Sequence, residues 1–241
     1  DSLGTPLTIG DRVIHSAVYP CYKCHLCVRG QTNHCIARSY PEAGIHPFFT
    51  GTYCDYMYIQ NRHPVFKVPD EIPDDVLAPV NCAMGTVLQG LISAEAEQGI
   101  SVVVQGAGGL GQMATAIAKD MGVDQVIILD RLENRLSLAE EFGADYTINI
   151  EEFNTADARI NRVWELTRGR GADIVIELVG RAELLGEGIK MLSNGGTFIE
   201  IGNIVPGQTV EIDPAIMLRG KKIIGSMMYQ PHLIPRALDF V

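Results

Sequence analysis

The chain has 241 residues, of which 46% are apolar and 20% charged, and its formal net charge is −10. This composition is typical of a globular protein that can bury a sizeable core. The acidic balance excludes partners that need a basic face, namely nucleic acid and anionic membrane surfaces. No apolar run approaches the roughly 20 residues that span a bilayer, and the first residues lack the order of a secretory signal.

The character of the chain changes near Glu97–Gly99. Before that point, short apolar stretches such as Val13–His15 and Tyr56–Ile59 are broken by Pro, Gly, Asn and Asp, which predicts strands in a small β-rich region. After it, candidate strands alternate with candidate helices, the pattern of a parallel sheet.

In this second region we expect six strands, at Ser101–Gln105, Gln125–Asp130, Tyr146–Ile148, Ile174–Glu177, Thr197–Ile201 and Lys222–Gly225. Helices are expected at Leu110–Met121, Leu132–Phe142, Thr155–Thr167, Arg181–Leu192 and Leu233–Phe240, with a turn at 194–196. Strands joined by right-handed crossovers in this number form a complete doubly wound sheet, so the predicted fold class is α/β.

Four of the six cysteines are clustered, as Cys21, Cys24, Cys27 and Cys35. Closely spaced thiols present sulfurs to one centre, and a structural zinc ion takes four such ligands in a tetrahedron. Disulfides and an iron–sulfur cluster are the alternatives. The first suits smaller secreted chains, and the second has a different last interval in bacterial ferredoxins. We therefore favour structural zinc, in a site with no open position for chemistry.

A glycine-rich loop follows the first strand of the second region, with Gly106, Gly108 and Gly111 in G-x-G-x-x-G spacing. Such a loop turns tightly, lets a pyrophosphate approach the backbone, and offers it a helix N-terminus. Asp130 ends the next strand, where a carboxylate accepts hydrogen bonds from ribose hydroxyls and repels a 2′-phosphate. The sequence therefore predicts NAD rather than NADP, although Arg131 and Arg135 weaken that preference; a Rossmann-like domain with another ligand, or with none, is the alternative.

Taken together, the cysteine lobe, the segment Cys82–Thr86 and the glycine loop resemble zinc-dependent medium-chain alcohol dehydrogenases. The stretches Gly10–Val13 and Gly171–Glu177 resemble that family too, and the resemblance covers essentially the whole chain. It implies a doubly wound Rossmann domain combined with a β-rich, GroES-like catalytic domain. It also implies hydride transfer between an alcohol or polyol and NAD, with zinc stabilising the alkoxide.

The same resemblance implies domain limits and residue roles. A partial catalytic domain with the zinc lobe would cover 1–90, the NAD-binding domain 91–226, and the start of a return to the catalytic domain 227–241. Cys82 would be a catalytic zinc ligand and Thr86 a neighbour of the nicotinamide; without the family, Cys82 would be taken for a buried apolar thiol. The cofactor-binding residues would be Gly106, Gly108, Gly109, Leu110, Gly111, Asp130, Arg135, Val179, Ile201, Gly202 and Ser226.

The sequence departs from the family at the catalytic zinc. That site also needs a cysteine and a Gly-His-Glu segment located before the cysteine lobe, whereas the chain begins at Asp1. It ends at Val241, directly after an expected helix. None of the histidines follows a glycine and precedes an acidic residue. They are His15, His25, His34, His46, His63 and His232. We therefore expect a fragment without dehydrogenase activity.

Two other hypotheses stay open, a non-catalytic zinc-stabilised NAD-binding module or redox sensor, and an interaction protein whose sheet is only a scaffold. Cys82 and Thr86 favour the enzyme over the first, and Asp130 argues against the second. The expected partners are a small-molecule alcohol and further copies of the chain, as a dimer or tetramer paired through Lys222–Met228, with neither nucleic acid nor membrane. Clustered thiols without a signal sequence predict a cytoplasmic protein.

Overall fold

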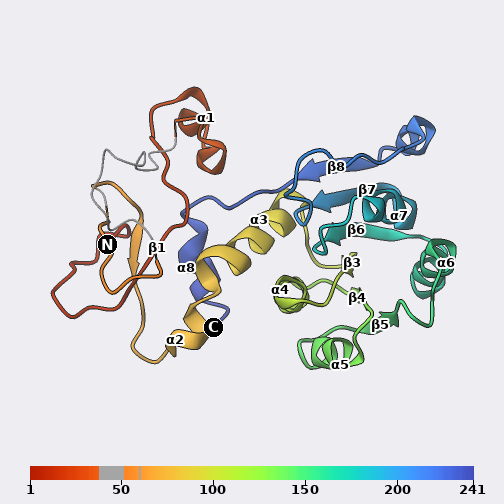
Figure 1. Cartoon of the computed structure of the whole chain (residues 1–241), viewed down its shortest axis with the longest axis horizontal. Coiled ribbons are helices and arrows are strands. Elements are labelled where there is room, and N and C mark those ends of the chain that lie inside the picture. The colour runs from red at the N-terminus through yellow and green to blue at the C-terminus, as the bar shows by residue number, and fades with distance from the viewer. Residues whose placement is uncertain (38–51, 60) are drawn as a thin grey trace. The chain divides into compact units, whose positions relative to one another are not determined.

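The computed structural model describes residues 1–37, 52–59 and 61–241 (Figure 1). It divides into two compact units. Unit 1 comprises Asp1–Gly85 and Met228–Val241, and unit 2 comprises Thr86–Met227. The assignment of functional domains with limits at 90 and 226 stays a prediction.

Unit 1 contains a two-stranded antiparallel sheet, in which β1 (Val13–His15) pairs with β2 (Val65–Lys67). Its other elements are short helices, namely α1 (His25–Val28), η1 (Thr32–His34), α2 (Asp74–Leu77), η2 (Val80–Met84) and α8 (Leu233–Leu238). The predicted strand at Tyr56–Ile59 is wrong, because this segment has no regular structure and both Tyr56 and Tyr58 are exposed.

Unit 2 is built on a six-stranded sheet with the order β5-β4-β3-β6-β7-β8, in which every neighbouring pair is parallel. The strands are β3 (Ser101–Gln105), β4 (Gln125–Asp130), β5 (Tyr146–Asn149), β6 (Ala172–Glu177), β7 (Leu192–Glu200) and β8 (Lys222–Gly225). This order confirms the predicted doubly wound α/β fold. The order reverses between β3 and β6, and ligands bind at such a reversal in sheets of this kind.

Helices cover both faces of the sheet (Figure 1). They are α4 (Gly109–Asp120) and α5 (Glu133–Glu141) on one face, and α6 (Ala156–Leu166) and α7 (Glu183–Met191) on the other. A further helix, α3 (Gly85–Ser93), precedes the sheet, and a 3₁₀ segment, η3 (Pro214–Arg219), precedes β8.

The core of unit 2 lies where these layers meet the sheet. Each of the four central strands contributes a side chain that is 0% exposed, namely Val103, Ile127, Val175 and Phe198. Burying such a side chain fully stabilises the fold by about 1.5–3 kcal/mol. β-Branched residues at successive buried positions therefore specify the central strands and hold their carboxyl ends in fixed positions.

The expected turn at 194–196 is also wrong. These residues belong to β7, which pairs with β6 through an irregularity between Ala172 and Ile174. Gly195 has a φ of +79°, a conformation that glycine adopts without strain, so the strand absorbs the bend instead of ending there.

The expectation about apolar length also needs correction. Asp74–Ser93 is a continuous helical stretch of 20 residues, formed by α2, η2 and α3, and by length and composition alone it could cross a membrane. Half of it is buried inside the structure. Core helices of globular proteins meet the same criterion, so this feature does not identify a membrane protein.

Candidate functional site

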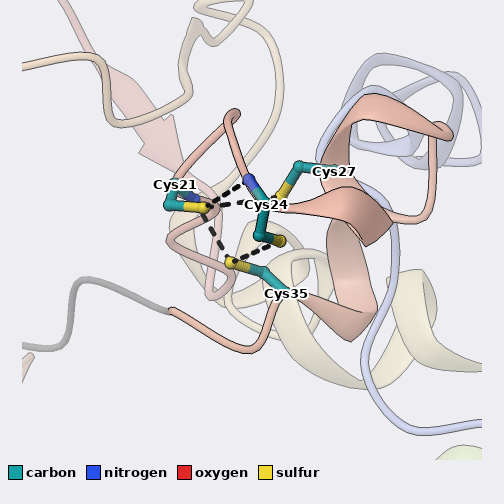
Figure 2. A group of neighbouring side chains, drawn as sticks. All are labelled: Cys21, Cys24, Cys27 and Cys35. Carbon is teal, nitrogen blue, oxygen red and sulfur yellow. Dashed lines mark hydrogen bonds between the residues drawn. The ribbon is translucent and has the colours of Figure 1, made fainter.

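The four clustered cysteines converge in unit 1 (Figure 2). Cys24 is the N-cap of α1, Cys27 lies within that helix, and Cys35 is the C-cap of η1. Their sulfur atoms lie within 4.8 Å of one another. The Cys21 and Cys27 sulfurs are 4.0 Å apart, and those of Cys24 and Cys35 are 3.9 Å apart. Such separations suit sulfurs around a tetrahedral ion with Zn–S bonds of about 2.3 Å.

The surroundings of these thiols also fit a cation. The backbone N–H groups of Cys21 and Cys24 donate to the sulfurs of Cys35 and Cys21, each at 3.3 Å. Backbone hydrogen bonds, first that from Cys27, lower the pKa of the Cys24 thiol to about 6. Burial and the neighbouring thiols raise the pKa of Cys27 to about 12. Four thiolates so close together need a divalent cation among them, and zinc supplies one.

The glycine loop lies in unit 2, at the carboxyl end of β3. Gly106 has a φ of +99°, and its N–H donates to the Leu129 carbonyl at 2.8 Å. A Cβ at Gly111 would lie 1.9 Å from the Gly106 carbonyl oxygen, so only glycine fits there. At Gly108 and Gly109 a Cβ would meet nothing within 4 Å. The loop therefore leaves open space beside the N-terminus of α4, as a bound pyrophosphate requires.

Asp130 is tied directly to this loop. One of its carboxylate oxygens accepts a hydrogen bond from the Ala107 N–H at 2.8 Å, and the other accepts one from the Leu132 N–H at 2.9 Å. The Arg135 guanidinium lies 3.9 Å away, and the Asp130 side chain is only 9% exposed. Asp130 thus fixes the shape of the loop, a role that the sequence did not indicate, while each of its oxygens keeps a free lone pair.

The residues expected around the nicotinamide also lie in unit 2. Val179 approaches the glycine loop, since a Cβ at Gly106 would lie 2.7 Å from its side chain. Ile201 and Ser226 meet at α3, where a Cβ at Gly90 would lie 3.2 Å and 3.6 Å from them. Leu110 is partly buried at the start of α4. Ser226 is buried, and its hydroxyl has no hydrogen-bond partner among the residues that the structure describes.

Sequence reasoning missed a buried acidic cluster beside Gly202. Glu177 is 0% exposed, and a Cβ at Gly202 would lie 2.4 Å from one of its carboxyl oxygens. Glu200 and Asn203 complete the cluster, with the Asn203 amide donating to both carboxyl groups at 3.1–3.2 Å. The sequence signal that could have indicated this cluster was an acidic residue, Glu177, at the end of an otherwise largely apolar strand.

Cys82 lies in η2, a π-helical turn that leads into α3. π-Helical turns occur frequently at functional sites. The Cys82 thiol is exposed, so its interpretation as a buried apolar thiol is wrong. The next turn packs tightly, since a Cβ at Gly85 would lie 2.6 Å from the buried Tyr229 ring. Thr86, the first residue of unit 2, is buried.

Among the described residues, no cluster of three potential metal ligands joins a histidine to Cys82. His15 donates from Nδ1 to the Ser16 carbonyl at 3.0 Å, and the same nitrogen lies 3.3 Å from Nε2 of the buried His63. Burial, followed by the nearby His15, lowers the pKa of His63 to about 4. His46 lies outside the described residues. Within the described parts of the chain, the cysteine lobe is the only cluster of three or more potential metal ligands.

Two family models match the chain. The zinc-binding dehydrogenase model matches residues 109–241, which is more than half of it, and the alcohol dehydrogenase GroES-like domain model matches residues 2–70. The first match contains five of the six strands of the parallel sheet, β4 to β8, and the second contains the cysteine lobe.

Individual relatives agree with these models. The erythritol/L-threitol dehydrogenase of Mycolicibacterium smegmatis is 32% identical over 98% of this chain and 63% of its own length. An alcohol dehydrogenase of Thermotoga maritima superposes with a TM-score of 0.91 at 29% identity, over 97% of this chain and 66% of that one. A solved NAD-dependent alcohol dehydrogenase gives 0.82 at 26% identity, over 96% and 65%.

The chain thus spans about two thirds of the length of these relatives. The resemblance predicted from the sequence is confirmed: the chain belongs to the zinc-binding dehydrogenases, the medium-chain zinc alcohol dehydrogenase family.

Proposed function

We propose that this chain is the cofactor-binding and structural-zinc portion of an oxidoreductase that transfers hydride between an alcohol or polyol and NAD. The observation that carries the proposal is the open backbone at Gly108 and Gly109, next to a carboxylate, Asp130, anchored in the same loop. The match to dehydrogenases of alcohols and of tetritols supports the substrate class.

Each part of the chain has a separate task in this proposal. The four lobe cysteines would hold one zinc ion in a closed site, which stabilises unit 1 without taking part in the reaction. The N–H groups at the start of α4 would hold the pyrophosphate, and Asp130 and Arg135 would face the adenosine ribose. Val179, Ile201, Gly202 and Ser226 would surround the nicotinamide. When bound, a catalytic zinc supplies Lewis-acid polarisation of the alcohol and NAD accepts the hydride.

Cys82 would be one ligand of the catalytic metal, and Thr86 a neighbour of the nicotinamide. A single thiolate cannot hold a catalytic zinc, which takes three protein ligands. Since no cluster of three potential metal ligands among the described residues includes Cys82, we expect the 241-residue chain to bind cofactor without oxidising alcohols. A zinc-stabilised NAD-binding module is therefore the second candidate for the chain as it stands.

The same proposal includes NAD as the preferred cofactor. The Asp130 carboxylate is held in place by two backbone N–H groups, so it cannot swing away from a 2′-phosphate without releasing the loop. A fixed negative charge there disfavours NADP, and the partly exposed Arg135 at 3.9 Å only partly offsets it.

Assembly and location complete the proposal. β8 is at the edge of the described sheet order, with Ile223 41% exposed, which supports pairing of two chains along this strand in a dimer or tetramer. The four lobe cysteines converge as a cluster of metal-ligand type, which supports a reducing compartment such as the cytoplasm.

Fluorescence titration with NADH and NADPH tests the function. We expect saturable binding of NADH at least about tenfold tighter than that of NADPH, a difference of about 1.4 kcal/mol. Asp130→Asn should reduce the preference for NADH over NADPH. Asp120→Asn, at the exposed end of α4, should leave that preference unchanged. Binding of neither nucleotide by a folded wild-type chain would rule the proposal out, and tighter binding of NADPH would overturn the cofactor preference.

A further inference from the structure

Two acidic side chains lie next to each other where β6 and β7 end. Glu177 and Glu200 are register partners on these parallel strands, so their side chains project from the same face of the sheet. Like charges placed directly opposite each other destabilise a sheet. This juxtaposition therefore needs a compensating feature.

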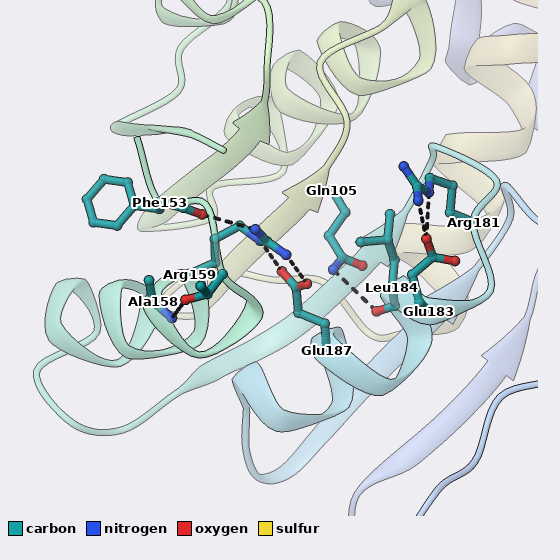
Figure 3. Close-up of polar contacts among 9 residues, drawn as sticks. Gln105, Phe153, Ala158, Arg159, Arg181, Glu183, Leu184 and Glu187 are labelled. Atoms are coloured by element: carbon teal, nitrogen blue, oxygen red, sulfur yellow. Dashed lines mark hydrogen bonds and ion pairs between the residues drawn. The ribbon is translucent and has the colours of Figure 1, made fainter. Parts of the chain in front are cut away.

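The strand neighbours of the pair, all within the described part of the chain, include no compensating cation. Glu177 pairs on its other side with Gln105 of β3, and Glu200 pairs with Gly225 of β8, so both flanking positions are neutral. The nearest cation along the chain, Arg181, is turned to Glu183 and donates to its carboxylate at 2.7 Å (Figure 3). The charge of Glu200 acts on Glu177 and raises the pKa of its carboxyl group.

The hydrogen bonds show how the two groups coexist. One Glu177 oxygen accepts from the Val179 and Gly180 N–H groups at 2.8 and 2.7 Å. The Asn203 side-chain amide bridges the other Glu177 oxygen and Glu200, at 3.2 and 3.1 Å. The two carboxyl groups therefore converge on one amide group in a buried site. Two ionised carboxylates held so close together would repel each other, which favours a proton on one of them.

The energetics agree with this geometry. Burial is the main factor that raises the pKa of Glu177 to about 7. The backbone N–H groups of Gly180 and Val179 act in the opposite direction, and the neighbouring Glu200 raises the pKa again. A raised pKa is the ordinary result for two carboxyl groups that share one buried site. The titration belongs to the pair rather than to either residue.

The pair is linked to the loops that would line the nicotinamide. Glu177 holds the backbone of Val179, whose side chain contacts the glycine loop at Gly106. Glu200 accepts the Asn203 N–H at 3.1 Å, directly after Gly202. A Cβ at Gly180 would lie 2.8 Å from the Gly202 carbonyl oxygen, so the two loops touch. Repulsion between two ionised carboxylates would act on this contact.

We propose that Glu177 and Glu200 share one proton and act as a positioning pair, which holds the loops after β6 and β7 in the shape that receives the nicotinamide half of the cofactor. This inference rests on the proposed function, and it deepens it by giving the cofactor site a dependence on pH. When the shared proton leaves, the two charges repel, the loops separate, and cofactor affinity falls. Affinity is therefore constant at low pH and declines as the pH rises past the titration of the pair.

Binding measurements across about pH 6 to about pH 9, around the titration of the pair, test the inference. The NADH dissociation constant of the wild-type chain should rise above about pH 7, at most about tenfold per pH unit for one linked proton. ADP-ribose lacks the nicotinamide, so its dissociation constant should stay constant over the same range. Glu177→Gln keeps a carbonyl oxygen for the Val179 and Gly180 N–H groups and carries no charge, so its NADH affinity should not depend on pH.

Two further variants and one spectroscopic signal complete the design. Glu200→Gln should also flatten the profile, because an ionised Glu177 then faces a neutral amide, whereas Glu141→Gln, an exposed residue of α5, should reproduce the wild-type profile. Infrared spectroscopy near pH 6 should show a protonated carboxyl in the wild type that is absent in Glu177→Gln.

The outcomes are distinguishable. A wild-type NADH profile that stays flat, or one that both glutamine variants retain, overturns the positioning pair, as does the absence of the protonated-carboxyl band. Failure of a folded chain to bind ADP-ribose and NADH at any pH overturns the proposed function instead, independently of the infrared result.

Discussion

Glycines in the loop after β3 are required for two different physical reasons. Gly111 is fixed by packing, because its Cα faces the Gly106 carbonyl oxygen. Gly108 is the N-cap of α4, with an ordinary extended conformation and open space in front of it. The first glycine therefore serves the fold, and the second serves the ligand.

Alanine substitutions separate these two roles. Gly111→Ala places a Cβ 1.9 Å from a backbone oxygen, which we expect to cost about 3 kcal/mol of folding stability. Gly108→Ala should cost about 1 kcal/mol or less, yet weaken NADH binding at least about tenfold. Thermal unfolding and NADH titration of both variants check this, and a stable Gly111→Ala protein or full NADH affinity in Gly108→Ala would contradict it.

The glycine loop could be predicted from the sequence, because three glycines in G-x-G-x-x-G spacing followed by an acidic residue at the end of the next strand are typical of dinucleotide-binding sites. The second role of Asp130 was not readable, since its bonds to Ala107 and Leu132 depend on how two loops meet. Glu177 escaped attention for a similar reason. Its partner Glu200 is distant in sequence and becomes a neighbour only through the pairing of β6 with β7.

At the level of elements, an ion pair joins the two helices on one face of the sheet (Figure 3). Arg159 of α6 donates to both carboxylate oxygens of Glu187 on α7, at 2.7 and 2.6 Å. Their side chains are only 16% and 6% exposed. Removing the charge of Glu187 would therefore leave the Arg159 guanidinium buried without a counter-charge.

Glu187→Gln should therefore destabilise unit 2 by about 3 kcal/mol. The matched control is Glu165→Gln, which breaks the exposed pair with Arg162 and should cost about 0.5 kcal/mol or less. Denaturant unfolding followed by the fluorescence of Trp164, which donates to the Lys190 carbonyl and so spans the same two helices, measures both. Equal costs for the two variants would refute this assignment.

The strands and helices of unit 2 follow closely from the sequence, because continuous apolar runs and amphipathic stretches alternate there. Unit 1 was predicted less well. β2 was missed, since a three-residue strand has too few positions to show a period. α3 was missed because glycine, here Gly85 and Gly90, has a low helix propensity. The helix nevertheless needs glycine at these positions for close contact with Tyr229 and Ile201.

For the whole molecule, stability should depend on pH through Glu177. Its pKa is about 7 in the folded chain and about 4.5 otherwise, so between these values the folded state holds a proton that the unfolded state has lost. Stability therefore falls as pH rises from about 4.5 to about 7 and levels off above. His63, with its pKa lowered to about 4, contributes an opposite slope from about pH 4 to about 6.5.

Because the two slopes overlap, the quantity to measure is the difference in unfolding free energy between the wild type and Glu177→Gln. That difference should decline across the window from about pH 4.5 to about 7 and then stay constant, since His63 contributes equally to both proteins. A difference that is constant with pH would show that Glu177 titrates normally.

From the cysteine lobe and the glycine loop together, we expect this chain to carry one closed zinc site and one NAD site. Native mass spectrometry of the intact chain, purified without chelators and mixed with NADH, tests both in a single measurement. We expect a mass that includes one zinc ion per chain, and a second species larger by one NADH. Loss of the zinc in Cys24→Ser with NADH binding retained would assign the metal to the lobe. A wild-type chain that is folded but carries neither zinc nor NADH would refute both the zinc site and the NAD site.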